Sequence, residues 1–202
     1  AILTFLEEKK LLGTFFLRRG GHYVTSKLPE KAIPDILKSL EIGLNKKEKE
    51  EAFIYLCHAF IQQKNYENAI KYAGEAIKLN SSEENYYMRI DALTKANKPN
   101  EALEDYNLLV EIAEYKLGMI ERRAMFKINY LKDYASVKNE LQNIIDTATT
   151  NLIGCPGCMS NYCETYFILG LAEYGNKNFK QAFKHLLKAE EIGYNPQSSD
   201  TA

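Results

Sequence analysis

The feature that most constrains this chain is a pattern of large and small apolar residues that recurs five times in the same order. The clearest copy runs from Glu50 to Glu83. Its defining residues are Phe53, Leu56, Cys57 and Phe60 in the first half, then Tyr66, Ala69, Ala73 and Ala76 in the second. Apolar residues at spacings of three and four predict amphipathic helices. Small residues at fixed places allow two helices to approach to about 8–10 Å. The pattern therefore predicts a series of closely packed helical hairpins.

Each copy can be located by one residue of its second helix, which we call the central residue. The central residues of copies one to five are Ala32, Ala69, Ala102, Val137 and Ala182. Their separations are 37, 33, 35 and 45 residues, so we expect insertions in the loops, the largest between copies four and five. Copy four matches least well because it lacks the central Ala. Five unrelated hairpins are the alternative, but they would not explain why small and aromatic positions recur in order.

For two glycines and one alanine the sequence predicts how closely the helices pack around them. Gly20 and Gly170 occupy the same place in the first helices of copies one and five. Because glycine in a helix costs about 1 kcal/mol relative to alanine, we expect both to be there for close helix packing. Ala52 lies near the start of a predicted helix, where we expect a larger side chain to be tolerated.

The chain resembles the tetratricopeptide repeat (TPR) family from about Gly13 to Gly193. The family's template places such residues over about 34 positions. The resemblance implies an all-α fold, a right-handed superhelical solenoid of about five TPR helical hairpins. It divides the chain into an N-terminal helix or partial repeat (1–12), the TPR domain (13–193) with an insert near 151–163, and a flexible tail (194–202). No capping helix follows copy five, so we expect a partner, a further domain or self-association to cover that end.

In TPR proteins the first helix of each hairpin lines a concave groove that holds a peptide or a helix. The resemblance implies that the partner-binding groove of this chain includes Ile54, His58, Tyr87, Asp91, Arg122, Phe126 and Tyr174. Chaperone-binding members hold a carboxylate with Lys and Asn at such positions. Here Leu17, Gly21, Ile54 and His58 stand there instead, which excludes the carboxylate clamp. The remaining apolar and aromatic surface favours an apolar peptide or amphipathic helix. Phe126 could equally belong to the core, where phenylalanine is usually buried.

Composition and motifs exclude several functions. A net charge of -1 gives no reason to expect nucleic-acid binding, and no apolar stretch is long enough to span a bilayer. The sequence contains no metalloprotease, nucleotide-binding or hydrolase motif, so we expect no enzymatic activity and no cofactor. The first residue is Ala1, so we expect a processed or excised chain. The sequence fixes no compartment but favours a soluble cytoplasmic protein over a secreted one.

A cysteine-rich insert is the one stretch outside the repeats whose side chains are candidates for chemistry. Three of the four cysteines, Cys155, Cys158 and Cys163, lie within nine residues of one another. The Pro-Gly pair between the first two favours a tight turn, which would bring them close enough for a disulfide. Free thiols are the simplest interpretation, a Cys155–Cys158 disulfide is the second, and a metal site would need a fourth ligand that the sequence does not supply. We therefore predict no metal site.

These observations predict a non-catalytic protein- or peptide-binding scaffold or adaptor. Two alternatives remain open from the sequence. The first is a ligand- or peptide-sensing regulatory domain of a larger protein, and the second is a redox- or metal-responsive module that uses the cysteine-rich insert. The sequence does not identify the partner.

Overall fold

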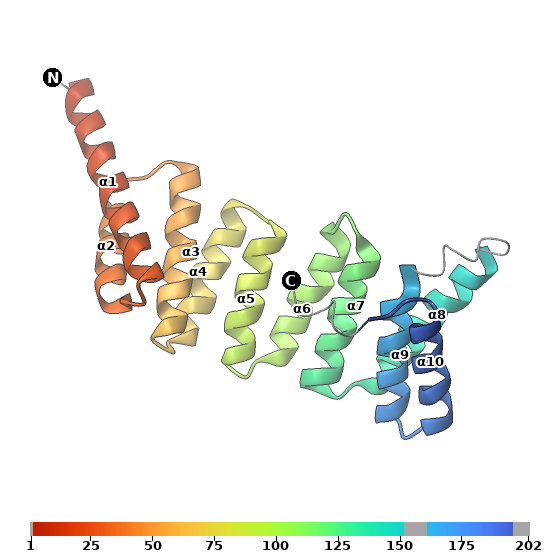
Figure 1. Ribbon diagram of the computed structural model, residues 1–202. Coiled ribbons are helices and arrows are strands. Elements are labelled where there is room, and N and C mark those ends of the chain that lie inside the picture. The colour runs from red at the N-terminus through yellow and green to blue at the C-terminus, as the bar shows by residue number, and fades with distance from the viewer. Residues whose placement is uncertain (1, 152–160, 196–202) are drawn as a thin grey trace. The chain divides into compact units, whose positions relative to one another are not determined.

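The computed structural model of the chain describes residues 2–151 and 161–195, and within these ranges all regular structure is helical (Figure 1). The elements are α1 (Ile2–Thr25), α2 (Pro29–Ile42), α3 (Lys46–Gln62), α4 (Tyr66–Leu79), α5 (Glu83–Lys95), α6 (Pro99–Ile112), α7 (Lys116–Phe126), the π-helical turn η1 (Lys127–Leu131), α8 (Tyr134–Asn151), α9 (Cys163–Gly175) and α10 (Phe179–Glu191). The all-α class is therefore confirmed. α1 runs without a break through residues 12 and 13, so the segment expected to precede copy one is the start of its first helix.

Consecutive helices form antiparallel hairpins whose contact is built on the central residues. All five central residues are buried, from 0% exposed at Ala69 and Val137 to 2% at Ala182. The two helix glycines serve close packing, as expected. A Cβ atom at Gly20 would lie 2.4 Å from Ile36 Cγ1, and one at Gly170 would lie 2.7 Å from Leu186 Cγ. Alanine at either glycine would therefore push the paired helices apart.

The turn inside each hairpin repeats with the same register as the central residues. One residue of each turn adopts the left-handed conformation. These residues are Lys27, Lys64, Asn97, Lys132 and Lys177, with φ between 56° and 63°. Each precedes its central residue by five positions. The turn thus identifies copy four as a repeat of the same kind, although its sequence matches the template least.

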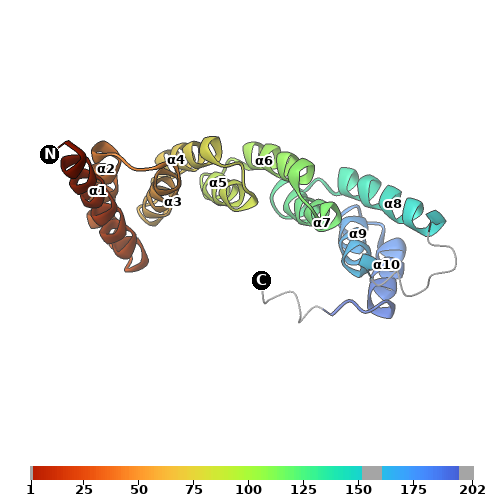
Figure 2. The same cartoon turned by 90° about the horizontal axis from the view of Figure 1, so that it is seen from above.

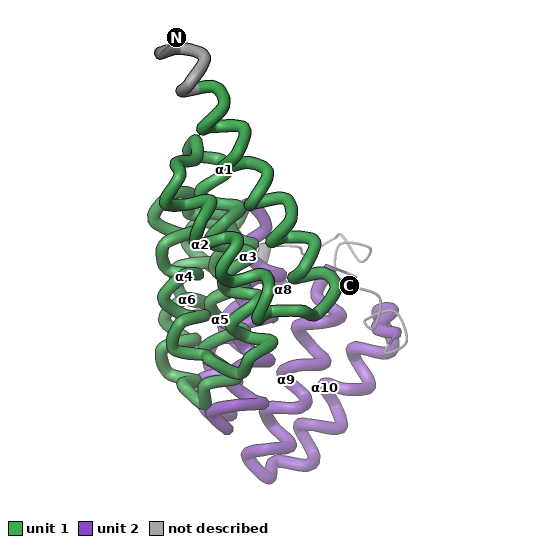
Figure 3. Tube along the Cα trace, turned by 90° about the vertical axis from the view of Figure 1, so that its left-hand side faces the viewer, with its two compact units in different colours: residues 1–113 green, residues 114–202 purple. Residues whose placement is uncertain are grey.

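The chain divides into two compact units, residues 1–113 and 114–202 (Figure 3). Unit 1 contains α1 to α6, and unit 2 contains α7 to α10. Within unit 1 the helices α3 and α5 lie on one side while α4 and α6 lie on the other (Figure 2). The first helices of successive copies are therefore neighbours in unit 1, with α3 in contact with both α1 and α5.

The expectation that Ala52 tolerates a larger side chain is wrong. Ala52 is fully buried in the core of unit 1, as is Ala59 seven residues later. Both lie on the face of α3 that also carries Tyr55 and Gln62. Those two residues meet α1, because the Tyr55 ring lies where a Cβ of Gly21 would be, and Gln62 Nε2 donates a hydrogen bond of 2.9 Å to the carbonyl oxygen of Val24. This face is buried against the preceding copy.

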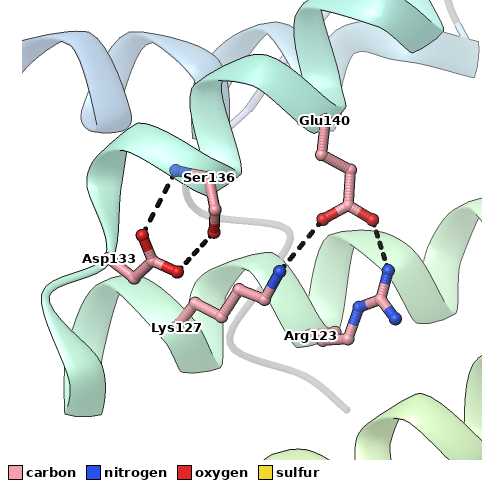
Figure 4. Close-up of polar contacts among 5 residues, drawn as sticks. All are labelled: Arg123, Lys127, Asp133, Ser136 and Glu140. Atoms are coloured by element: carbon pink, nitrogen blue, oxygen red, sulfur yellow. Dashed lines mark hydrogen bonds and ion pairs between the residues drawn. The ribbon is translucent and has the colours of Figure 1, made fainter.

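Copy four contains one more residue in its first helix than the other copies. In copies one and three an Arg–Asp ion pair joins residues sixteen apart, Arg19 with Asp35 and Arg89 with Asp105. The corresponding pair in copy four, Arg123 with Glu140, is seventeen apart (Figure 4). The π-helical turn η1 lies between the two partners. A π turn adds a residue to a helix at one place, so it absorbs the extra residue and lets copy four keep the common turn.

Polar contacts around η1 hold this irregular region in place (Figure 4). Glu140 of α8 accepts from Arg123 and, at 3.3 Å, from Lys127 Nζ. Asp133 accepts from the backbone N–H of Ser136 at 3.2 Å and from the hydroxyl of the same residue. Asp133 thereby caps the first turn of α8, because a side-chain oxygen at a helix start satisfies backbone donors that have no partner inside the helix.

Candidate protein-binding surface

The neighbouring first helices α3 and α5 of unit 1 carry four of the expected site residues, and Asp91 of α5 lies close enough to His58 of α3 to affect its pKa. Ile54 and His58 lie one turn apart on α3, and Tyr87 and Asp91 lie one turn apart on α5. Residues four apart share a helix face. Ile54 and Tyr87 are half-buried, while His58 and Asp91 are exposed. We call these four residues the α3–α5 surface.

Charges on the α3–α5 surface are largely balanced. Asp91 forms an ion pair with Lys95 one turn along α5. Burial lowers the pKa of His58 even though part of the residue remains exposed; Asp91 opposes this decrease and Lys95 adds to it. His58 is therefore neutral near pH 7. The surface offers two half-buried apolar or aromatic groups beside a neutral imidazole and a compensated charge pair.

Tyr87 is held by the second helix of its own hairpin. Its ring lies edge-on to the Tyr106 ring of α6, with 6.4 Å between the ring centroids and 77° between the planes. Edge-to-face aromatic pairs are favourable. Tyr87 is thus a half-exposed aromatic side chain with restricted freedom, which lowers the entropy lost when such a residue binds a partner.

Copy one does not extend this surface in the way the family template implies. Leu17 and Gly21, which correspond to Ile54 and His58, are both buried, and the Tyr55 ring of α3 lies against Gly21. Polar contacts also join α1 to α3. Thr14 donates to Glu48 Oε1 at 2.7 Å, and Arg18 pairs with Glu51 at 3.3 Å. The expected positions of copy one therefore do not reach the surface.

In unit 2 the expected residues Arg122 and Tyr174 lie at the surface, whereas Phe126 does not. Phe126 is only 5% exposed and stacks on Tyr130 at 4.8 Å between centroids. The prediction that Phe126 faces a partner is thus corrected, and the π turn explains the error. In copy two the small packing residue of the first helix, Cys57, lies seven residues before the left-handed Lys64. In copy four the corresponding residue, Ala124, lies eight residues before the left-handed Lys132. The template register is therefore shifted by one before η1, and Glu121 and Met125 take the places assigned to Arg122 and Phe126.

A buried carboxyl group in unit 2 was not anticipated from the sequence. Glu121 of α7 is buried and accepts a hydrogen bond from the hydroxyl of Thr165, which is fully buried on α9. Burial raises the pKa of Glu121 to about 7; the Thr165 hydrogen bond opposes the increase, and the neighbouring Glu164 adds to it. The only sequence signal appears after the one-residue shift is applied. Glu121 then occupies a position that is apolar or aromatic in the other copies.

Of the three cysteines of the insert, the structure describes Cys163. Cys155 and Cys158 lie outside the described residues, so their pairing stays a prediction. Cys163 begins α9 as a free, half-buried thiol. Cys57 is buried in α3, where burial raises the pKa of its thiol to about 12, so it is protonated at neutral pH. Among residues 2–151 and 161–195 no three His, Cys, Asp or Glu side chains come together as metal ligands would.

In the described ranges no helix combines the length and apolar character that a bilayer span needs.

Among the solved structures that resemble this fold are three proteins. The crystal structure of YrrB, described as a TPR protein with an unusual peptide-binding site, aligns with a TM-score of 0.55 and 17% identity, over 90% of this chain and 87% of that one. MamA protein aligns with a TM-score of 0.59 and 18% identity, over 95% and 97% of the two chains. BtubC (BKLC) from P. vanneervenii aligns with a TM-score of 0.52 and 14% identity, over 95% and 89%. By sequence, no family model and no curated protein matches.

Proposed function

We propose that this chain, an all-α repeat solenoid with the tetratricopeptide-repeat fold, is a non-catalytic scaffold that binds a segment of another protein on its α3–α5 surface. The observation that carries the proposal is the juxtaposition of Ile54, His58, Tyr87 and Asp91 on two adjacent first helices. YrrB has this fold and is described as having a peptide-binding site, which supports a binding function for such a scaffold.

The chemistry of the surface favours an apolar segment. Tyr87 supplies a restrained aromatic ring, and aromatic residues in well-packed positions contribute most of the energy at protein interfaces. Ile54 adds aliphatic area on the neighbouring helix α3. Because Asp91 is already compensated by Lys95 and His58 is neutral near pH 7, the surface does not demand a charged partner. A short peptide or one apolar face of a helix fits these features.

Affinity capture with matched variants tests the proposal. The immobilised chain is used to capture proteins from a lysate of the source cells, and mass spectrometry quantifies each one. We expect Tyr87→Ala and Ile54→Ser to remain folded by circular dichroism and to lose the same captured protein by at least tenfold. Leu108→Ala, which truncates an exposed side chain of α6 in the same unit, is the matched control and should retain it.

Retention of that protein by both surface variants would contradict the proposal and place the interface elsewhere. Arg122 and Tyr174 remain proposed partner contacts of unit 2, and Arg122→Ala and Tyr174→Ala can be measured in the same assay.

A further inference from the structure

Unit 2 contains a buried contact between α7 and α9 with a carboxyl group at its centre. Glu121 of α7 is 8% exposed, and Thr165 of α9 is fully buried. The hydroxyl and the backbone N–H of Thr165 both donate to the carboxyl group of Glu121. We call Glu121 and Thr165 the α7–α9 contact.

A carboxyl group at this position is not needed to build the repeat. Once the one-residue shift of copy four is counted, the residues of the other copies that correspond to Glu121 are Leu17, Ile54, Tyr87 and Phe167. Thr165 corresponds to Ala52, which is also buried against the preceding copy. An apolar pair would fill the same space without a desolvated polar group, so packing alone does not explain the α7–α9 contact.

The ionisable neighbours of Glu121 do not offset a negative charge. Tyr115, which precedes α7, and Glu164 at the start of α9 both interact with Glu121. Tyr162 and Cys163, which precede Glu164, interact in turn with Tyr115. Each of these four groups is either neutral or negative at any pH, so ionisation of Glu121 would add a negative charge to a group of acids.

Two cations of copy four pair with another carboxylate. Arg123 of α7 and Lys127 of η1 both pair with Glu140 of α8 (Figure 4), and Arg122 lies at the surface. The hydroxyl of Thr165 and the dipole of α9 favour the ionised form of Glu121, but burial of a carboxylate among neighbouring acids costs more than they return. Burial therefore dominates and raises the pKa of this carboxyl group to about 7. The closed contact thus favours a neutral carboxyl group.

The connection of α7 to the rest of unit 2 contains a structural hinge. α9 contacts both α8 and α10, so these three helices form one body. α7 contacts α9 and continues into the π turn η1, which leads to α8. Helices bend at π turns, and such turns are frequent at functional sites. A rotation about η1 can therefore separate α7 from α9 while α8, α9 and α10 stay together.

We propose that the α7–α9 contact is a proton-controlled latch. With Glu121 protonated, α7 packs against α9; with Glu121 ionised, α7 separates from α9 about η1 and water reaches the carboxylate. The closed state binds more protons than the open state between the ordinary pKa of 4.5 and the raised pKa of about 7. Closure is therefore strongest below pH 4.5 and weakens as pH rises through this window. The latch goes beyond the α3–α5 binding function, because it controls the conformation of unit 2.

Hydrogen exchange of the full chain over a pH series from 5 to 8, corrected for intrinsic rates, tests the latch when peptides from each helix are analysed separately. The opening equilibrium constant of α7 should rise roughly tenfold or more across the series, whereas those of α8 and α10 should change by less than about twofold. Equal acceleration of α7, α8 and α10 would overturn the latch, because unit 2 would then loosen as a whole. An unchanged α7 would overturn it as well.

Two variants, checked for folding by circular dichroism at pH 5, assign the response to the carboxyl group. Glu121→Gln cannot ionise and should remove the acceleration of α7. Thr165→Val removes a donor to the carboxylate and should shift the midpoint of the response to higher pH. The matched control is Glu50→Gln in unit 1, which should leave α7 unchanged; Glu50 is half-buried and accepts from Asn80 Nδ2 at 2.9 Å and from Asn85 Nδ2 at 3.0 Å. A response that persists in Glu121→Gln, or a midpoint that stays in place in Thr165→Val, would overturn the proposal.

Discussion

Copy two in unit 1 and copy four in unit 2 show how much a repeat can change without losing its hairpin. Both bury their central residue and both place a left-handed lysine five residues before it. The first helix of copy two is a continuous α-helix, α3, whereas that of copy four is the shorter α7 followed by the π turn η1. The central residue and the turn therefore define the hairpin, and the first helix can gain a residue if a π turn takes it up.

The contact between the two helices also differs between copies at one fixed position. This position lies three residues after the central residue and is occupied by Asp35, Tyr72, Asp105, Glu140 and His185. The acidic residues pair with an arginine of the first helix. Tyr72 stacks on Phe60 at 5.5 Å and His185 on Tyr166 at 6.0 Å between centroids. One position thus accepts either an ion pair or an aromatic stack, provided that the first helix supplies the matching partner.

The two units should respond to pH in opposite directions, and this is the largest effect that we expect. Glu121 binds an extra proton in the folded state between its ordinary pKa of 4.5 and its raised pKa of about 7. Its contribution therefore destabilises unit 2 as pH rises through that window, by about 3 kcal/mol at about 1.4 kcal/mol per pKa unit. In unit 1 the lowered pKa of His58 makes stability rise with pH towards its ordinary value of 6.5.

Hydrogen exchange at pH 5 and pH 8, corrected for intrinsic rates, measures both units in one sample. Protection of α7 and α9 should fall between the two pH values, while that of α3 and α5 should not. Glu164, whose pKa burial also raises, acts in the same direction, and His185, whose pKa burial lowers, opposes it in part. Glu121→Gln keeps an acceptor for Thr165 and should remove most of the decrease. An unchanged decrease in that variant would show that Glu121 is not its source.

Overpacking the central position should have the next largest effect. Ala69→Leu and Ala182→Leu insert a large side chain between paired helices, and such changes typically cost about 1–3 kcal/mol. Because both alanines are almost completely buried, we expect similar losses of unfolding free energy in chemical denaturation. Leu108→Ala on the exposed side of α6 should change it by less than about 0.5 kcal/mol. A loss confined to one unit would mean that the central position is not equivalent in the two.

The ion pairs within unit 1 should show a smaller, graded effect. Asp105→Ala leaves Arg89, whose side chain is 26% exposed, without its carboxylate, whereas Asp35→Ala leaves Arg19, which is 42% exposed. Loss of the partner of a more buried charge costs more, so we expect a loss of about 2 kcal/mol for Asp105→Ala and a smaller loss for Asp35→Ala. Thermal melts of the two variants compare them directly. Equal losses would show that burial of the arginine does not set the cost.

Much of the fold could be predicted from the sequence, because small residues recur at the same places in successive copies. The five central residues, the packing role of Gly20 and Gly170 and the all-α class all followed from spacing. The one-residue shift in copy four was missed, because counting residues in fixed steps from the template does not detect a π turn. That shift misplaced Phe126. The spacing of the Arg–acid pairs could have revealed the extra residue. It is sixteen residues for Arg19 and Asp35 and for Arg89 and Asp105, but seventeen for Arg123 and Glu140.

Part of the candidate site followed from the sequence and part did not. His58 and Asp91 could be placed together because the template sets which positions of neighbouring first helices meet. The burial of Gly21 depends on the Tyr55 ring of the next copy, and the exposure of Phe179, Phe183 and Leu187 on α10 depends on whether another helix packs against them. Neither property belongs to a single repeat, so a repeat-by-repeat prediction cannot provide it.

The central claim is that copies two and four are the same hairpin, with one extra residue absorbed by η1. Matched deletions test it in one denaturation measurement. Asn129 of η1 and Ile61 of α3 each lie three residues before the left-handed lysine of their copy. Deleting Ile61 rotates the preceding part of α3 by about 100°. This rotation removes Leu56 from the core at a cost of about 3 kcal/mol or more.

Deletion of Asn129 should restore the sixteen-residue spacing of copies one and three between Arg123 and Glu140, and convert η1 to α-helix. We expect it to change the free energy of unfolding by no more than about 1 kcal/mol. A loss as large as that caused by deletion of Ile61 would contradict the account, because it would show that the π turn is required by copy four and does not accommodate an extra residue.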